Sequence, residues 1–200
     1  MLLLLIRHGE TRRVESETGI ANPALTAHGH WQARRLADWL RATELIAHIA
    51  VSPLQRARQT AEPLLEEFGL EPEVIPGLAE FDARASSYIP MEEMRAKRDP
   101  RFRAMIEGRW EDFGGEIQPK AFRRSVVDTL NGLAATHPAQ TVAVVCHGAV
   151  INAYLGDVIG TPRLLWFEPR YTSMHRVLVS RRGVRSVETV NECTHLQASG

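Results

Sequence analysis

Two stretches of this 200-residue chain run from apolar residues into a histidine. Residues 2–9 read LLLLIRHG and contain Arg7 and His8, while residues 142–148 read VAVVCHG and contain His147. A neutral imidazole can attack phosphorus when its second ring nitrogen is held by a hydrogen-bond acceptor. A neighbouring guanidinium neutralises charge on the oxygens of the transferred group. These residue types therefore predict phosphoryl-transfer chemistry.

A third stretch adds another cation. Residues 49–60, IAVSPLQRARQT, pass from an apolar run into a helical pattern and place Arg56 one turn into it. The planar guanidinium group of arginine can donate two parallel hydrogen bonds to the oxygens of one phosphate group. A glycine follows each histidine directly, Gly9 after His8 and Gly148 after His147, and a residue without a Cβ lets the backbone come close to a ligand. Where the three stretches meet, two guanidiniums and two imidazoles would form a pocket for phosphate.

The rest of the chain explains how they could meet, because apolar strand patterns alternate with helical ones. We expect strands at 2–6, 48–52, 72–75 and 141–145, helices at 26–42, 53–68, 120–135 and 148–156, and half-exposed antiparallel strands at 173–180 and 185–191. This order predicts an α/β fold, a three-layer α/β/α sandwich with a mostly parallel central sheet. The carboxyl ends of its parallel strands share one edge, where ligands bind.

Two helix starts have residue types that favour them. Thr26 precedes the first helical pattern and is a suitable N-cap. Ser52 is a suitable N-cap for the second pattern, and Pro53 suits its first helical position.

Composition bounds the functional classes. Lys and Arg number 24, as do Asp and Glu, and the sequence pI is about 7.1, so no long-range field favours nucleic acid or a membrane. The two cysteines have no metal-site spacing, and no nucleotide or metal motif occurs. We expect one cytoplasmic domain over 1–200, without cofactor or metal. Its expected partner is a small phosphate monoester, and a homodimer is left open.

The motifs LIRHGET (5–11), SPLQRARQT (52–60) and VVCHGAV (144–150) resemble the three signatures of the histidine phosphatase superfamily, in its phosphoglycerate mutase-like branch. Supporting matches are LTAHGHWQA (25–33), GGE (114–116) and NECTHL (191–196). The resemblance implies the phosphoglycerate mutase-like fold and His8 as the phosphorylated nucleophile. It implies a phosphate pocket of Arg7, Arg56, His147 and Gly148, with Thr11 in support.

The resemblance also implies a general acid within a Leu-x-Glu stretch, which here ends in Glu80. Asp82 lies two residues further on, so both side chains point the same way in an extended segment and spacing alone cannot choose between them. The resemblance favours Glu80. We then expect Asp82 to be a turn or capping residue paired with Arg84.

The sequence departs from the family pattern where substrates would be held. Val14 stands where the family often has Asn, and Ile117 where it often has Ser. Residues 84–118 read as a helical insertion or lid. Its basic run at 95–103 is better interpreted as a solvated helical face than as a lid that collects anions. The resemblance therefore implies the phosphate chemistry of the family for this sequence, but it does not imply the family's contacts with the rest of the substrate.

The sequence therefore predicts a metal-independent phosphatase that hydrolyses small phosphate monoesters through a phosphohistidine. A phosphoglycerate-type mutase is the alternative enzyme, and a phospho-ligand binding protein without turnover is the alternative outside enzymes.

Overall fold

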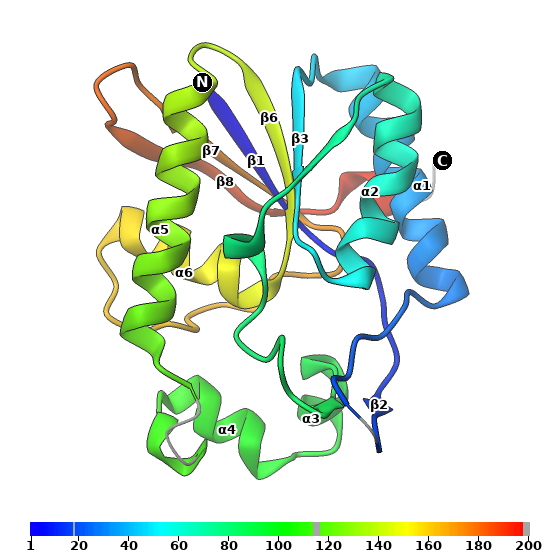
Figure 1. Cartoon of the computed structure of the whole chain (residues 1–200), viewed down its shortest axis with the longest axis vertical. Helices are drawn as coiled ribbons and strands as arrows, with labels where there is room; N and C mark the ends of the chain where they lie inside the picture. The colour runs from blue at the N-terminus through cyan, green and yellow to red at the C-terminus, as the bar shows by residue number, and fades with distance from the viewer. Residues whose placement is uncertain (18, 114–116, 198–200) are drawn as a thin grey trace.

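A six-stranded sheet forms the centre of the computed structural model, which describes residues 1–17, 19–113 and 117–197. The strand order is β4-β3-β6-β1-β7-β8 (Figure 1). The strands are β1 (Leu2–Arg7), β3 (His48–Val51), β4 (Pro72–Val74), β6 (Thr141–Cys146), β7 (Met174–Val179) and β8 (Arg185–Glu192). The first four are mutually parallel, while β7 and β8 run antiparallel to their neighbours.

Helices cover both faces of this sheet. They are α1 (Ala27–Thr43), α2 (Gln55–Phe68), α5 (Pro119–Thr136) and α6 (Gly148–Ile159). Figure 1 shows α1 and α2 on one side of the sheet and α5 and α6 on the other. The predicted three-layer α/β/α fold with a mostly parallel sheet is confirmed. No helix within the described ranges has the length and apolarity needed to cross a membrane.

The apolar residues of β1, near the start of the chain, pack into the core on both faces of the sheet. Successive strand residues point to opposite faces, so Leu3 and Leu5 join the cluster that contains α5 and α6. Leu4 and Ile6 join the cluster that contains α1 and α2. All four are fully buried. A strand covered on both sides needs an unbroken apolar run rather than an alternating one, which explains the residues before Arg7.

The two predicted helix starts have different outcomes. Thr26 is the N-cap of α1, and its hydroxyl accepts a hydrogen bond from the Gly29 N–H. The prediction for α2 is wrong, because Leu54 is the N-cap and the helix begins at Gln55. The reason is that the hydrogen bonding of the sheet continues one residue past the end of β3: the Ser52 N–H donates to the Val145 carbonyl of β6.

A close backbone crossing holds the loop after β1 against α1. A Cβ at Gly9 would lie 2.7 Å from the Gly29 carbonyl oxygen, and a Cβ at Gly29 would lie 2.3 Å from the Glu10 carbonyl oxygen. Gly9 is therefore needed for this packing contact rather than for approach to a ligand. Gly148 is different, since a Cβ there would meet nothing within 4 Å.

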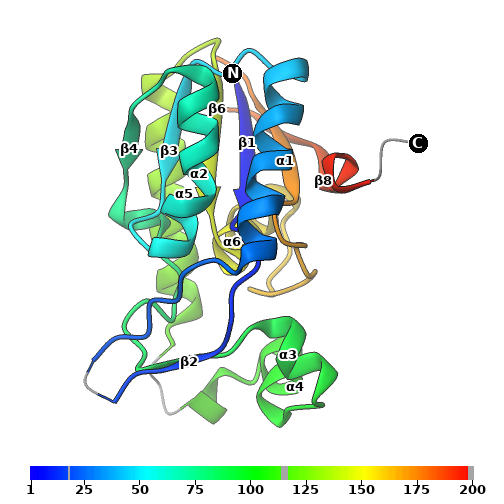
Figure 2. The same ribbon diagram turned by 90° about the vertical axis from the view of Figure 1, so that its right-hand side faces the viewer.

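The segment that contains α3 and α4, between β4 and α5, extends beyond the carboxyl ends of the parallel strands (Figure 2). It contains β5 (Ser87–Tyr88), α3 (Met91–Ala96) and α4 (Pro100–Glu107), and β5 pairs with β2 (Val14–Glu15). Short 3₁₀ helices occur at Pro76–Leu78, Trp110–Phe113 and Thr194–Leu196. The GGE match at 114–116, inside the predicted 84–118 insertion, lies outside the described residues.

The basic run at 95–103 forms exposed ion pairs. The pairs are Arg95 with Glu168, Lys97 with Glu93, Arg101 with Asp99 and Arg103 with Glu107. The four long cations of this run that form pairs keep at least half of their side-chain surface exposed. These contacts agree with the interpretation as a solvated helical face, except that Arg101 also lines the candidate active-site cavity.

Candidate active site

Four side chains meet where the parallel strands end. Arg7 is the last residue of β1 and His8 follows it, Arg56 is in the first turn of α2, and His147 is the N-cap of α6. The sheet register aligns Arg7 with Cys146, so the two histidines leave neighbouring strands at the same level. Their ring centroids lie 5.2 Å apart. Each of the four residues is at most 4% exposed.

One ring nitrogen of His8 is held in the way that nucleophilic attack requires. Nδ1 lies 2.8 Å from the Gly9 carbonyl oxygen, which can only accept, so Nδ1 carries the proton. Nε2 then carries the lone pair. Burial, followed by the charges of Arg56 and Arg7, lowers the pKa of His8 well below its usual 6.5. The ring is therefore neutral at neutral pH.

His147 has the opposite nitrogen engaged. Its Nε2 lies 2.7 Å from the Ser52 hydroxyl, whereas its buried Nδ1 has no hydrogen-bond partner among the described residues. When the hydroxyl donates to Nε2, the proton of a neutral ring lies on Nδ1 and can be donated to an anion. Burial and then the charge of Arg56 lower the pKa of His147 well below 6.5. Ser52, expected to be a helix cap, instead orients this ring.

The two arginines are held by groups that the motifs do not include. Arg7 forms a two-pronged ion pair with Glu92 of α3, with nitrogen–oxygen distances of 2.5 and 3.2 Å, and its guanidinium lies 4.2 Å from the Tyr171 ring centroid. Arg56 lies 4.6 Å from the Tyr88 ring centroid. Its buried Nε and Nη2 have no hydrogen-bond partner in the described structure. Sequence reasoning missed both tyrosines and Glu92, which lie outside the motifs.

Glu80 approaches from the segment after β4 and contacts the start of α6. Its carboxylate oxygens accept from the Phe81 and Ala149 N–H groups, each at 3.0 Å. Burial, followed by the negative charge of Asp82, raises the pKa of Glu80 from 4.5 to about 7. A carboxyl group with this pKa can both give and take a proton near neutrality.

Asp82 has a partner other than the expected one. Its carboxylate lies 3.5 Å from Nη2 of Arg56, so the predicted pairing with Arg84 is wrong. The turn at residues 81–84 places Asp82 in the lining of the cavity, to which the buried Arg56 also belongs. Burial raises the pKa of Asp82, against the opposing effect of Arg56.

Thr11 does not line the cavity. Its buried hydroxyl donates to the Tyr88 hydroxyl at 3.0 Å, and Tyr88 lies against Arg56. Its expected supporting part is therefore exerted through the tyrosine that packs on Arg56.

A cavity of about 1140 Å³ opens from this cluster. Arg7, His8, Arg56, Glu80 and Gly148 line one end. Apolar side chains from the 81–113 segment, α5 and the loop after α6 line much of the remainder: Phe81, Met91, Met94, Phe122, Leu165 and Phe167. The arrangement combines a cationic end, suited to a phosphate group, with an apolar chamber.

Comparison with known proteins adds to this geometry. The family model described as "Histidine phosphatase superfamily (branch 1)" matches residues 3–192. A probable phosphoglycerate mutase GpmB of Citrobacter koseri is 26% identical over 212 aligned positions, covering 97% of this chain and 94% of that protein. An uncharacterized phosphatase PhoE of Bacillus subtilis is 30% identical and covers 78% of this chain and 76% of that protein.

Other similarities are more partial or concern the fold. A PE-PGRS family protein of Mycobacterium tuberculosis is 39% identical over 88 residues, which are 42% of this chain but 15% of that longer protein. A solved phosphoserine phosphatase of Entamoeba histolytica, in a mutant form, superimposes with a TM-score of 0.75 at 23% identity, covering 98% of this chain and 99% of that one.

Proposed function

Because this chain belongs to the histidine phosphatase superfamily, branch 1, we propose that it hydrolyses phosphate monoesters through a phosphohistidine on His8 and without a metal ion. The observation that carries this proposal is the orientation of His8. Its Nδ1 proton is held by the Gly9 carbonyl, and burial keeps the ring neutral, so Nε2 carries the lone pair. Arg7 and Arg56 line the same cavity as His8.

The proposed first step transfers the phosphoryl group to His8. Arg7, Arg56 and the Nδ1 proton of His147 hold its oxygens and neutralise the charge spread over them. A bond forms between Nε2 of His8 and phosphorus while the ester bond to the leaving oxygen breaks. Glu80 gives its proton to that oxygen, so the alcohol leaves neutral.

The second step returns the enzyme to its starting state. Glu80, now ionised, takes a proton from a water molecule whose oxygen attacks phosphorus. The nitrogen–phosphorus bond breaks, and its electron pair returns to Nε2 of His8. Inorganic phosphate leaves, and Glu80 again holds the proton that the next cycle needs.

The apolar chamber supports a finer proposal about the substrate. Phosphate monoesters with an extended alkyl or aromatic group would bury that group against side chains such as Phe81, Phe122 and Phe167. Each buried methylene contributes about 0.8 kcal/mol. In a series of n-alkyl phosphates, kcat/KM should therefore rise by up to about fourfold per added methylene. A flat series would rule out this substrate class while leaving the hydrolytic mechanism untouched.

A phosphoglycerate-type mutase is the second candidate, because the GpmB relative spans nearly the whole of this chain. The two candidates differ in the acceptor of the phosphoryl group. We expect inorganic phosphate to appear faster than 2-phosphoglycerate when 3-phosphoglycerate is supplied. The reverse order of rates would establish the mutase.

The nucleophile is tested by trapping the intermediate. Brief incubation with p-nitrophenyl phosphate and a quench without acid should label His8, as mapped by mass spectrometry. His8→Ala should abolish turnover, whereas His28→Ala, which alters an exposed histidine of α1, should retain it. Label on His147 would contradict the assignment, and so would near-normal turnover of His8→Ala.

Metal independence needs its own test. Exhaustive chelation should leave kcat unchanged. In the proposed mechanism Arg7 and Arg56 provide the positive charge, and His147 the hydrogen bond, that stabilise the phosphate oxygens in place of a metal ion. Loss of activity that a divalent ion restores would refute this part of the proposal.

A further inference from the structure

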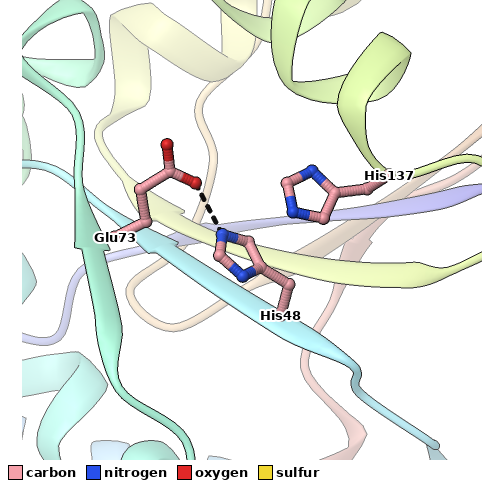
Figure 3. A group of neighbouring side chains, drawn as sticks. All are labelled: His48, Glu73 and His137. Atoms are coloured by element: carbon pink, nitrogen blue, oxygen red, sulfur yellow. Dashed lines mark hydrogen bonds and ion pairs between the residues drawn. The ribbon is translucent and has the colours of Figure 1, made fainter.

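Two histidines and a glutamate lie together at the end of the sheet opposite the candidate active site. His48 is the first residue of β3, Glu73 belongs to β4, and His137 is the C-cap of α5. Arg56, by contrast, follows the carboxyl end of β3. Figure 3 shows the three side chains converging from the three elements. Their ligand atoms all lie within 4.8 Å of one another.

His137 is already oriented as a metal-binding histidine would be. Its Nδ1 lies 3.0 Å from the Leu133 carbonyl oxygen, which can only accept, and 2.9 Å from the Thr136 hydroxyl. That hydroxyl gives its own proton to backbone carbonyls of the same helix, so the Nδ1 proton of His137 is held by these two oxygens. Nε2 of the neutral ring then carries the lone pair. Metal-binding histidines characteristically donate their other ring N–H to a carbonyl or carboxylate in this way. The α5 carboxyl terminus beside it carries the partial negative charge of the helix dipole, which favours a cation.

His48 and Glu73 supply the other two groups. Nε2 of His48 lies 2.6 Å from a carboxylate oxygen of Glu73. Cross-strand pairing opposes Ala50 to Glu73, and His48 lies two residues before Ala50, so both side chains point to the face that α5 covers. The rings of His48 and His137 are stacked with centroids 4.2 Å apart. The side chains of His48 and Glu73 remain 23% and 47% exposed, so solvent ions can reach them.

The donor types select the class of ion. Ca²⁺ and Mg²⁺ prefer sites built from oxygen ligands. Two imidazoles with one carboxylate suit a divalent transition-metal ion, and Zn²⁺ takes this set with water in the fourth position. We propose that Nε2 of His48, Nε2 of His137 and a carboxylate oxygen of Glu73 bind Zn²⁺. The ion replaces the proton that His48 shares with Glu73, and that proton is released to solvent.

Such a site would join parts of the fold that are distant in the sequence. It links the β3–β4 edge of the sheet to the end of α5, whose earlier turns line the candidate active-site cavity through Phe122 and Val126. An ion that binds only the folded chain stabilises it in proportion to its occupancy. The expected role is therefore structural, and turnover does not depend on it.

Calorimetric titration of the chelator-treated full-length chain with Zn²⁺, in a buffer that does not bind zinc, tests the proposal. Wild type should bind one ion per chain, and Zn²⁺ should raise its Tm. Glu73→Gln and His137→Gln should each weaken binding by at least about tenfold and remove the Tm increase. His28→Gln controls for loss of an exposed histidine, and His8→Gln controls for binding at the active site. Both controls should bind as wild type does.

A second readout makes the result independent of stability. Co²⁺ in place of Zn²⁺ should give visible absorption bands in wild type that are lost in His137→Gln, while unloaded His137→Gln keeps its circular dichroism and p-nitrophenyl phosphate turnover. The proposal is overturned if wild type shows no saturable binding. It is equally overturned if Glu73→Gln and His137→Gln bind Zn²⁺ as tightly as wild type, or if only His8→Gln loses binding.

Discussion

Replacing Glu80 by Gln should separate two kinds of phosphate ester. Gln keeps the size of the side chain and one oxygen that can accept from the N–H of Phe81 or Ala149. It cannot give a proton to a leaving oxygen. Alkyl phosphates release a strongly basic alkoxide and need that proton, whereas p-nitrophenyl phosphate releases a phenolate that leaves without one.

The raised pKa of Glu80 sets the size of the effect. With a pKa of about 7, about half of the enzyme holds the proton at pH 7; at the ordinary value of 4.5 the fraction would be about 0.3%. Removing a positioned general acid costs about 10²- to 10⁴-fold. We therefore expect Glu80→Gln to lose that factor in kcat/KM for glycerol phosphate, and much less for p-nitrophenyl phosphate.

The pH dependence gives an independent measure of the same group. Wild-type kcat/KM for glycerol phosphate should fall as pH rises through about 7, because Glu80 loses the proton that it donates. Glu80→Gln should lack this alkaline limb. The assay is phosphate release from glycerol phosphate and p-nitrophenolate release from the aryl ester, each measured from acid to alkaline pH.

Asp82→Asn is the matched control, because Asp82 lies on the same turn and pairs with Arg56. It should keep the alkaline limb and most activity on both esters, although the limb should shift to lower pH as the charge that raises the Glu80 pKa is removed. If Asp82→Asn shows the ester-selective loss and Glu80→Gln does not, the acid has been misassigned.

Three further perturbations follow from the structure. The folded pKa of Glu80 exceeds its unfolded value, so wild type should lose stability relative to Glu80→Gln as pH rises from about 4.5 to 7; urea unfolding that shows no such pH-dependent difference would contradict the burial of this carboxyl. Glu92→Gln should tighten competitive inhibition by inorganic phosphate, because the Glu92 carboxylate competes with phosphate for the buried Arg7 guanidinium; weaker inhibition would instead make Glu92 a support for Arg7. Gly29→Ala should cost about 1–3 kcal/mol in urea unfolding, since its Cβ would meet the Glu10 backbone, whereas Gly132→Ala, in open space on α5, should gain about 0.5–1 kcal/mol.

The sequence predicted the architecture and the cationic end of the cavity, for a common reason. Strand and helix patterns are local, and the order of parallel strands then brings Arg7, His8, Arg56 and His147 to one edge. The orientation of each ring could not be predicted in the same way. It depends on contacts such as Ser52 with His147, which lie 95 residues apart.

The remaining differences also arise from tertiary contacts. The β3 backbone continues hydrogen bonding through Ser52, so the start of α2 moves to Gln55. Asp82 pairs with Arg56 rather than its near neighbour Arg84, because the turn faces a buried cation. Neither Glu92 nor Tyr171 belongs to a recognisable motif, and only folding of α3 and the loop before β7 brings them to Arg7.

The cavity has two walls of different origin, and they should vary independently. The cationic wall is anchored on strand ends inside a sheet buried on both faces, where a displacement would disturb both core clusters. Much of the apolar wall belongs to short helices and turns between β4 and α5, which lie beyond the end of the sheet rather than within it. Exchanging residues 93–113, which include Met94 and Met105 of the apolar wall but neither Glu80 nor Glu92, for the corresponding residues of a relative should therefore redirect selectivity among esters while the phosphohistidine chemistry is inherited unchanged. For anyone wishing to alter this protein, that segment is a natural cassette.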